Sequence, residues 1–368
     1  MVHIKASIIA GARPNFMKIA PLVEPLRAVG IRTRIIHTGQ HYDQQMSQTF
    51  FEELRIPRPD VNLEVGSGSH VHQLAEVMKR LEIEFTDARP DVVIVVGDVN
   101  STLAAALTAN KLGIYVAHVE AGLRSGDRTM PEEINRILTD SISDFLFTSE
   151  PCAERNLLKE GVCPNKIHFV GNVMVDTLLA HLDKARSGHP YRKFGLDKGD
   201  YALLTLHRPS NVDDPDRLRP ILKAVHEVSK RLPVVFPVHP RTRSRIEQFG
   251  LANEAEFNGY LDVPPQGYLT MLGLMDSARF VLTDSGGIQE ETTALRVPCR
   301  TLRENTERPI TLEVGTNRLV GWRTADIVEA VDSLVKRPDR EASVPEYWDG
   351  KASVRIAERL RSKFSATR

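Results

Sequence analysis

The chain has 368 residues, of which 41% are hydrophobic, and this length and apolar content suit two globular domains with a core each. Its 48 Lys and Arg residues balance 48 Asp and Glu residues, so no overall field attracts nucleic acid or an anionic membrane. No apolar run approaches the length of a membrane span, and the N-terminal run is too short for a signal peptide, so we expect a cytoplasmic protein.

Short β-rich runs alternate with helical patterns in the first half of the chain. The runs are HIKASIIA, RTRIIHT, DVVIVVG, GIYVAHV, DFLFTS and KIHFVG, and STLAAALTANKLG is typical of the helical patterns between them. This alternation predicts a doubly wound α/β domain, which we assign to residues 1–172.

The same alternation returns after a polar stretch with Gly and Pro at 186–200. The later runs are YALLTLH, LPVVFPVH, ARFVLTD and VPCRTL, and they predict a second α/β domain within residues 173–350. A last helix at 352–364 could pack back on the first domain. Two such domains that face one another form a cleft, and ligands of parallel sheets bind beyond the carboxyl ends of the strands. We therefore expect the active site there.

Acidic residues follow two of the predicted strands. Asp98 comes after DVVIVVG and Glu120 after GIYVAHV, so parallel strands would place both carboxylates at one edge of the sheet. Glu132 opens a helix and shares a face with Arg136 through their i, i+4 spacing. Each acid alone is also typical of a helix cap or a surface charge. Three acids that converge on one edge are less easily explained in that way.

Cationic residues also lie at predicted strand ends. Arg13 and Lys18 lie where the first strand meets the first helix, and two cations there could bind a diphosphate. His207 follows a strand of the second domain, where an imidazole could hydrogen-bond a phosphate or transfer a proton. Arg308 is a further candidate ligand of a phosphate oxygen, whereas the group around Arg243 is typical of a solvated basic face.

The segment FVLTDSGGIQEETTALRVP, Phe280 to Pro298, reads as a strand, a turn of small residues and a helix. This order places free backbone N–H groups at the positive end of a helix dipole, which suits a phosphate. An ordinary tight turn is the alternative, and Gly-Gly alone does not decide between them.

Several other site types are not indicated. GSGSH lacks the third glycine of a dinucleotide fingerprint, and the chain has neither a P-loop motif nor a G-x-S-x-G elbow. The three cysteines have no CxxC spacing, and HTGQH has no evident carboxylate partner for a metal. We therefore expect neither a cofactor nor a metal ion.

Three segments are specific enough to identify a family. They are HVEAGLRSGDRTMPEEINR (His118–Arg136), LTDSGGIQEE (Leu282–Glu291) and TERP (Thr306–Pro309), supported by GARPNFMKIAPL and GDVNST. Through them the chain resembles the non-hydrolysing UDP-N-acetylglucosamine 2-epimerases from about Ile4 to about Gly321. The resemblance implies the GT-B fold, with two Rossmann-like domains and the active site in the cleft between them. It also implies a homodimer, no cofactor, and a role in cell-surface polysaccharide biosynthesis.

The resemblance also implies roles for individual residues. The diphosphate would lie on Ser285, Gly286 and Gly287, surrounded by Arg13, His207 and Arg308. Glu291 would bind the ribose, and Gln266 and Met271 would lie by the uracil. The sugar would face the catalytic residues Asp98, Glu120 and Glu132, with Lys18 and Arg136 completing the polar shell and His207 also counted as catalytic. Gln40 and His239 fit a second, allosteric substrate site.

The implied reaction interconverts UDP-GlcNAc and UDP-ManNAc by elimination of UDP to 2-acetamidoglucal and re-addition. The partners are then a UDP-sugar and UDP. Departures from the common bacterial pattern, such as Asn15 and Met271, leave the exact sugar open. The alternatives are a 2-epimerase of a related UDP-2-acetamido sugar such as a diacetamido-uronate, a hydrolysing epimerase that releases ManNAc and UDP, a GT-B glycosyltransferase, and a non-catalytic nucleotide-sugar sensor.

Overall fold

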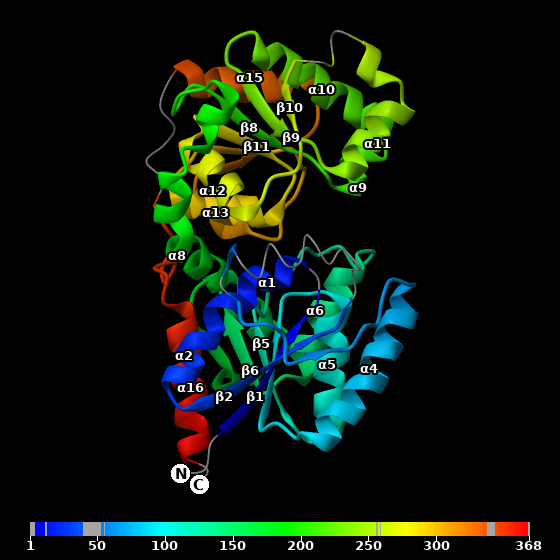
Figure 1. Cartoon of the computed structure of the whole chain (residues 1–368), viewed down its shortest axis with the longest axis vertical. Coiled ribbons are helices and arrows are strands. Elements are labelled where there is room, and N and C mark those ends of the chain that lie inside the picture. Colours follow the sequence, from blue (N-terminus) through cyan, green and yellow to red (C-terminus); the bar gives the residue numbers. More distant parts are fainter. Residues whose placement is uncertain are drawn as a thin grey trace. The chain divides into compact units, whose positions relative to one another are not determined.

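The computed structural model describes residues 4–11, 13–39, 53–54, 56–254, 257, 259–336 and 343–366. The chain divides into two compact units (Figure 1). Unit 1 comprises Met1–Ala180 and Glu346–Arg368, and unit 2 comprises His181–Pro345. The division falls within helix α8 (Val173–Ser187), and the C-terminal helix belongs to unit 1.

Unit 1 contains a seven-stranded parallel sheet with the strand order β3-β2-β1-β4-β5-β6-β7. Its strands are β1 (Ile4–Ala10), β2 (Ile31–His37), β3 (Val61–Asn62), β4 (Val92–Val96), β5 (Tyr115–Val119), β6 (Phe145–Thr148) and β7 (Ile167–Phe169). The central strand β4, VVIVV, is buried at every position, as expected for a parallel strand covered on both faces. The strand order reverses between β1 and β4, which creates a switch point at the carboxyl edge.

Helices flank this sheet. They are α1 (Arg13–Ile19), η1 (Ala20–Leu22), α2 (Val23–Ala28), α4 (His70–Asp87), α5 (Asn100–Lys111), α6 (Pro131–Ile142), α7 (Pro151–Lys159), η2 (Pro164–Lys166) and α16 (Ala352–Ala366). Small residues let α5 pack closely between α4 and α6. The C-terminal helix α16 packs on α2 and η1 (Figure 1), and the Asp176 carboxylate accepts hydrogen bonds from the first two N–H groups of α16.

Unit 2 contains a six-stranded parallel sheet with the order β10-β9-β8-β11-β12-β13. Its strands are β8 (Ala202–Thr205), β9 (Val234–Pro237), β10 (Leu261–Val263), β11 (Phe280–Thr283), β12 (Cys299–Thr301) and β13 (Asn317–Leu319). Here the order reverses between β8 and β11, so these two strands flank the switch point of unit 2.

Helices cover both faces of the second sheet as well (Figure 1). They are η3 (Pro190–Phe194), α9 (Pro209–Val212), α10 (Pro215–Ser229), α11 (Pro240–Gln248), η4 (Leu251–Asn253), α12 (Tyr268–Ser277), α13 (Gly286–Leu295), α14 (Pro309–Glu313) and α15 (Thr324–Lys336). Apolar side chains of α10 and α15 pack with Phe236 and Phe280 in one core layer. Those of α12 and α13 pack with Leu203 and Val281 in the other.

The predicted α/β class with two doubly wound parallel sheets is confirmed. Most of the predicted β-rich runs contain a strand because a parallel strand buried on both faces reads as a continuous apolar run. Within the described part of the chain, no helix combines the length and the apolar character needed to cross a bilayer.

Candidate active site

The carboxyl edge of the unit 1 sheet holds an ion pair between Glu120 and Lys18. Glu120 directly follows β5, and its carboxylate pairs with the ammonium group of Lys18 from α1, with both side chains largely buried. Glu120 has a φ of 72°, a left-handed conformation that costs a non-glycine residue on the order of 1–3 kcal/mol. Such strain is typical of functional positions, where the fold fixes a side chain that the backbone alone would place elsewhere.

Gly97, directly after β4, leaves room for this ion pair. A Cβ atom at Gly97 would lie 3.0 Å from Lys18 Nζ and 3.6 Å from Glu120 Oε2, and its φ of +65° also favours glycine. Asn15, a buried residue of α1, donates from Nδ2 to the Val96 carbonyl oxygen at 2.9 Å. Helix α1 is therefore held against β4, which fixes the position of Lys18.

Asp98 lies next to Gly97 and is held by α6. Arg136 Nη2 donates to Asp98 Oδ2 at 2.5 Å, and Asn135 Nδ2 donates to the backbone oxygen of Asp98 at 2.9 Å. The guanidinium of Arg136 is almost fully buried, whereas about a quarter of the Asp98 side chain, 24%, stays exposed. Asp98 is therefore both oriented and accessible.

The first turn of α6 presents two glutamates with different environments. Glu133 is buried, pairs with Arg136 Nη1 at 2.7 Å, and accepts N–H hydrogen bonds from Ser125 and Gly126. Burial opposes the ionisation of Glu133, but these backbone hydrogen bonds and Arg136 outweigh it and hold its pKa below the usual value. Glu132, the predicted catalytic acid, is half-buried on the same turn. Glu133 thus orients Arg136, a role that the sequence did not assign.

In unit 2 the predicted strand, turn and helix are present at the switch point. Strand β11 ends at Thr283, Ser285 is the N-cap of α13 in an extended conformation, and Gly286 is the first helical residue. A Cβ atom at Gly286 would lie 2.9 Å from Glu307 Oε1, so a larger residue there would displace that carboxylate. The first N–H groups of α13 form the positive end of a ten-residue helix.

Arginines gather near this helix start, each close to a buried carboxylate. Glu307 pairs with Arg208 at 3.1 Å and with Arg303 at 3.0 Å. Burial opposes the charge on Glu307, but the guanidinium groups of Arg308, Arg303 and Arg208 hold its pKa far below the usual value. Arg308, a predicted diphosphate ligand, lies buried with Nε 2.9 Å from Glu290 Oε1. Three guanidinium groups therefore lie around the start of α13, each paired with a buried carboxylate.

Asp284 orients His207, another predicted residue. The buried Asp284 carboxylate accepts the backbone N–H groups of His207 at 3.0 Å and Arg208 at 2.8 Å, and its Oδ1 lies 3.2 Å from His207 Nδ1. Burial opposes ionisation of Asp284, but these His207 and backbone contacts lower its pKa. With Nδ1 turned to Asp284, the half-exposed His207 ring offers Nε2 to a ligand.

The predicted nucleoside ligands lie on α12, α13 and the loop before α12. Glu291 is buried beside the Tyr268 hydroxyl, and burial raises the pKa of Glu291 to about 8. Met271 packs on the core layer of α12 and α13. Gln266 Nε2 donates to the Pro264 carbonyl oxygen at 2.6 Å. The structure thus brings Glu291 next to α12, with Met271 on that helix.

The remaining predicted positions are Arg13, Gln40 and His239. Arg13 is the first residue of α1, with its side chain beyond the described part of the chain, and Gln40 lies outside the described residues. His239 caps α11, accepting from the Arg241 N–H at 3.2 Å, and its ring centroid lies 5.8 Å from that of His207. His239 is therefore a neighbour of the predicted diphosphate site. Arg243 forms an exposed pair with Asp262.

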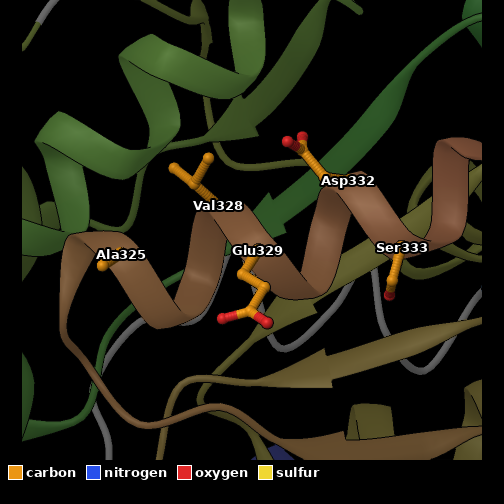
Figure 2. A pocket seen from close by; sticks show the side chains of 5 residues that line it. All are labelled: Ala325, Val328, Glu329, Asp332 and Ser333. Atoms are coloured by element: carbon orange, nitrogen blue, oxygen red, sulfur yellow. The ribbon is translucent and has the colours of Figure 1, made fainter.

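A shallow hollow on α15 is separate from all these residues. It is lined by Ala325, Val328, Glu329, Asp332 and Ser333 along one side of that helix (Figure 2). Asp332 is already paired with Arg231, and no predicted site residue lines the hollow. Among the residues that the structure describes, no group of three His, Cys, Asp or Glu side chains is placed to hold a metal ion.

Comparison with known proteins supports the family resemblance of the sequence motifs. The family model for UDP-N-acetylglucosamine 2-epimerase matches residues 26–361. The chain is 45% identical to the UDP-N-acetylglucosamine 2-epimerase of Methanocaldococcus jannaschii, over 97% of this chain and 99% of that protein. It is 42% identical to the UDP-2,3-diacetamido-2,3-dideoxy-D-glucuronate 2-epimerase of Pseudomonas aeruginosa, again over 97% of this chain and 99% of the relative.

Solved structures agree with the sequences. The crystal structure of the M. jannaschii UDP-GlcNAc 2-epimerase in complex with UDP-GlcNAc and UDP matches with a TM-score of 0.89 at 45% identity, covering 98% of this chain and 100% of that chain. The Neisseria meningitidis UDP-GlcNAc 2-epimerase bound to UDP-GlcNAc matches with a TM-score of 0.85 at 29% identity, covering 99% and 100%. The predicted GT-B-like fold and the predicted family resemblance are both confirmed. The chain belongs to the UDP-N-acetylglucosamine 2-epimerase family.

Proposed function

We propose that this protein is a non-hydrolysing UDP-N-acetylglucosamine 2-epimerase that interconverts UDP-GlcNAc and UDP-ManNAc. The observation that carries the proposal is the 45% identity, over nearly the whole chain, to a protein whose crystal structure contains UDP-GlcNAc and UDP. Two features of the switch points support it: carboxylates in unit 1, and a helix N-terminus surrounded by arginines in unit 2.

Unit 2 would bind the nucleotide. The N–H groups of Ser285, Gly286 and Gly287 at the start of α13 suit the diphosphate, because they carry the positive end of the helix dipole. Arg308 and His207 would add charge-assisted contacts. For the nucleoside, we assign the ribose to Glu291 and the uracil to Gln266 and Met271.

Unit 1 would perform the chemistry at the sugar. The C2–H bond is not acidified by a carbonyl group, so the route is elimination across C1–C2. A carboxylate removes the C2 proton, the C1–O bond breaks, and UDP leaves with the bonding electrons. The product is 2-acetamidoglucal. Protonation of C2 on the opposite face and return of the diphosphate oxygen to C1 then give the epimer, and no water is consumed.

Asp98, Glu120 and Glu132 are the groups that we assign to proton transfer and to the positive charge that develops at C1. Asp98 and Glu120 each pair with a cation, Arg136 and Lys18, which keeps their oxygens oriented as proton acceptors. In unit 2, His207 with Asp284 behind it would stabilise the departing diphosphate or protonate it. His239 lies next to His207, so it is a candidate ligand of either the diphosphate or a second substrate molecule.

A related sugar nucleotide is the second candidate substrate, because the chain is 42% identical to a 2-epimerase of a UDP-diacetamido-glucuronate. The test is NMR of the purified protein incubated with UDP-GlcNAc and, separately, with the UDP-diacetamido-glucuronate. UDP-ManNAc from the first mixture supports the proposal. Turnover of the uronate alone selects the second candidate, and free ManNAc with UDP indicates the hydrolysing reaction. The family resemblance also leads us to propose a cytoplasmic homodimer, which sedimentation analysis tests for its oligomeric state.

A further inference from the structure

His118 on β5 is fully buried and both of its ring nitrogens contact acceptors. Nδ1 lies 2.6 Å from Asp140 Oδ1, and Nε2 lies 2.8 Å from the backbone oxygen of Gly97. The side chains of His118 and Asp140 are 0% and 1% exposed, so no solvent competes for these contacts. A backbone carbonyl only accepts hydrogen bonds, so Nε2 must carry a proton.

The surroundings of Asp140 decide the state of Nδ1. The other carboxylate oxygen, Oδ2, accepts the Gly122 N–H at 3.0 Å and lies 2.8 Å from Arg124 Nη1. A carboxylate that already accepts from Gly122 and lies against the guanidinium of Arg124 accepts a further hydrogen bond from Nδ1–H of His118. In this geometry each ring nitrogen is placed to donate a hydrogen bond, Nδ1 to Asp140 and Nε2 to the Gly97 carbonyl.

Helix α6 thereby holds the segment Gly97–Asp98 at three points. Asn135 donates to the backbone oxygen of Asp98, Arg136 donates to its carboxylate, and Asp140 reaches Gly97 through His118. Arg136 and Asp140 are one helical turn apart, so they lie on the same face of α6. The segment cannot shift relative to α6 without breaking these contacts.

The same segment lies close to the second predicted acid. Glu120 follows His118 by two residues, and a Cβ at Gly97 would lie 3.6 Å from Glu120 Oε2. A displacement of the Gly97 carbonyl would therefore change the separation of the Asp98 and Glu120 carboxylates. Displacements of about 1 Å among reacting groups can cost a factor of 100 in rate.

We propose that His118, doubly protonated and paired with Asp140, is a positioning residue that fixes the Gly97 carbonyl and through it the Asp98 carboxylate for proton transfer. The proposal rests on the proposed epimerase function for its kinetic part, but not for the protonation of the ring. The residue has no path to the substrate because it is buried, so its role is to orient.

His118→Gln tests the kinetic part, with His168→Gln as the matched control. His168 lies on β7 of the same sheet, where burial and then the charge of Arg359 lower its pKa to about 4, and it contacts none of the predicted acids. We expect His118→Gln to lower kcat about 10- to 100-fold while leaving UDP affinity unchanged. The control should keep the wild-type kcat. A folded His118→Gln protein with wild-type kcat would overturn the proposal.

Nitrogen-15 NMR of histidine-labelled protein tests the protonation directly. The His118 signals, identified by their loss in His118→Gln, should show protons on both ring nitrogens at neutral pH, and Asp140→Asn should remove one of them. An unprotonated nitrogen in the wild-type ring, or two protons retained in Asp140→Asn, contradicts the inference. This measurement also decides the question if His118→Gln does not fold, because Asp140→Asn then identifies the signals. If the wild-type protein leaves UDP-GlcNAc unchanged, the proposed function fails but the ring spectrum still supports or overturns the imidazolium.

Discussion

The two switch points differ in the kind of charged group at their centre. In unit 1 the central groups are the carboxylates of Asp98 and Glu120, each held by one cation from a neighbouring helix. In unit 2 the central groups are arginines at the start of α13, held by the buried carboxylates of Glu307 and Glu290. We therefore propose that the same kind of sheet edge serves proton transfer in one unit and anion binding in the other, depending on which charged groups lie nearest the strand ends.

Asp98→Asn should have the largest effect and should separate the two regions. The amide keeps the shape of the side chain but cannot accept the proton, so we expect kcat to fall by about 100- to 10,000-fold. UDP affinity, which we assign to unit 2, should not change. Initial rates by NMR and calorimetry with UDP measure the two quantities, and Glu329→Gln on the surface of α15 is the control. A variant that loses UDP affinity and keeps its rate would reverse our assignment of the regions.

Glu291→Gln should show a pH-dependent effect on stability. The folded-state pKa of about 8 lies above the unfolded value near 4.5, so the folded protein binds the extra proton and loses stability as pH rises from about 4.5 to about 8. The glutamine variant has no such loss. As pH rises through this range, the free energy of unfolding of the variant should therefore increase relative to that of the wild type, by a total on the order of a few kcal/mol. Above about pH 8 the difference should stay constant.

Denaturant titrations of both proteins between pH 5 and 9 measure this difference. The surface variant Glu329→Gln should run parallel to the wild type. If the plots of unfolding free energy against pH are parallel for Glu291→Gln and the wild type as well, Glu291 is ionised in the folded protein and burial does not raise its pKa.

Arg208→Ala tests the cationic region with less disturbance than removal of Arg308. Arg208 is partly exposed, and after its removal Arg303 still neutralises Glu307. Arg208 Nη2 would lie 3.8 Å from a Cβ atom at Gly286, so we expect it to contact a diphosphate bound there, and its loss should weaken UDP binding by about 1.5–3 kcal/mol. Calorimetry with UDP gives the value, and unchanged affinity would place the diphosphate away from this arginine.

Arg243→Ala should have the smallest effect. The Arg243–Asp262 pair is exposed on both sides, and such pairs contribute about 0–1 kcal/mol to stability. UDP affinity should equal that of the wild type. A clear loss of UDP affinity would extend the binding region to α11 and contradict the interpretation of Arg243 as a solvated surface charge.

The sequence predicted the fold and the strand-end residues well for a physical reason. Strands such as β4 are buried on both faces and read as apolar runs, and the residue after each run lies at the carboxyl edge. Asp98, Glu120 and His207 were placed at the strand ends in this way, and the structure confirms that position. The conformation of Glu120, with its positive φ, could not be read from the residue type.

The orienting residues were not found because their partners are far away in the chain. Asp284 accepts from the N–H of Arg208 across 76 positions, and His118 reaches the Gly97 carbonyl across 21. Helical spacing also did not single out the right glutamate: the i, i+4 rule pointed to Glu132, whereas the glutamate seen in an ion pair with Arg136 is Glu133 at i, i+3. Pairings across strands need the register of the sheet, which a single sequence does not contain.

The central claim is that unit 1 carboxylates epimerise C2 by elimination and re-addition, and epimerisation of UDP-GlcNAc in D2O tests it most directly. Carboxylic acids exchange their protons with solvent, so the proton returned to C2 should be replaced by deuterium. We predict that UDP-ManNAc formed in D2O carries deuterium at C2 by NMR. Product with only protium at C2, formed without any added cofactor, would contradict the elimination route and the roles of Asp98, Glu120 and Glu132 in it.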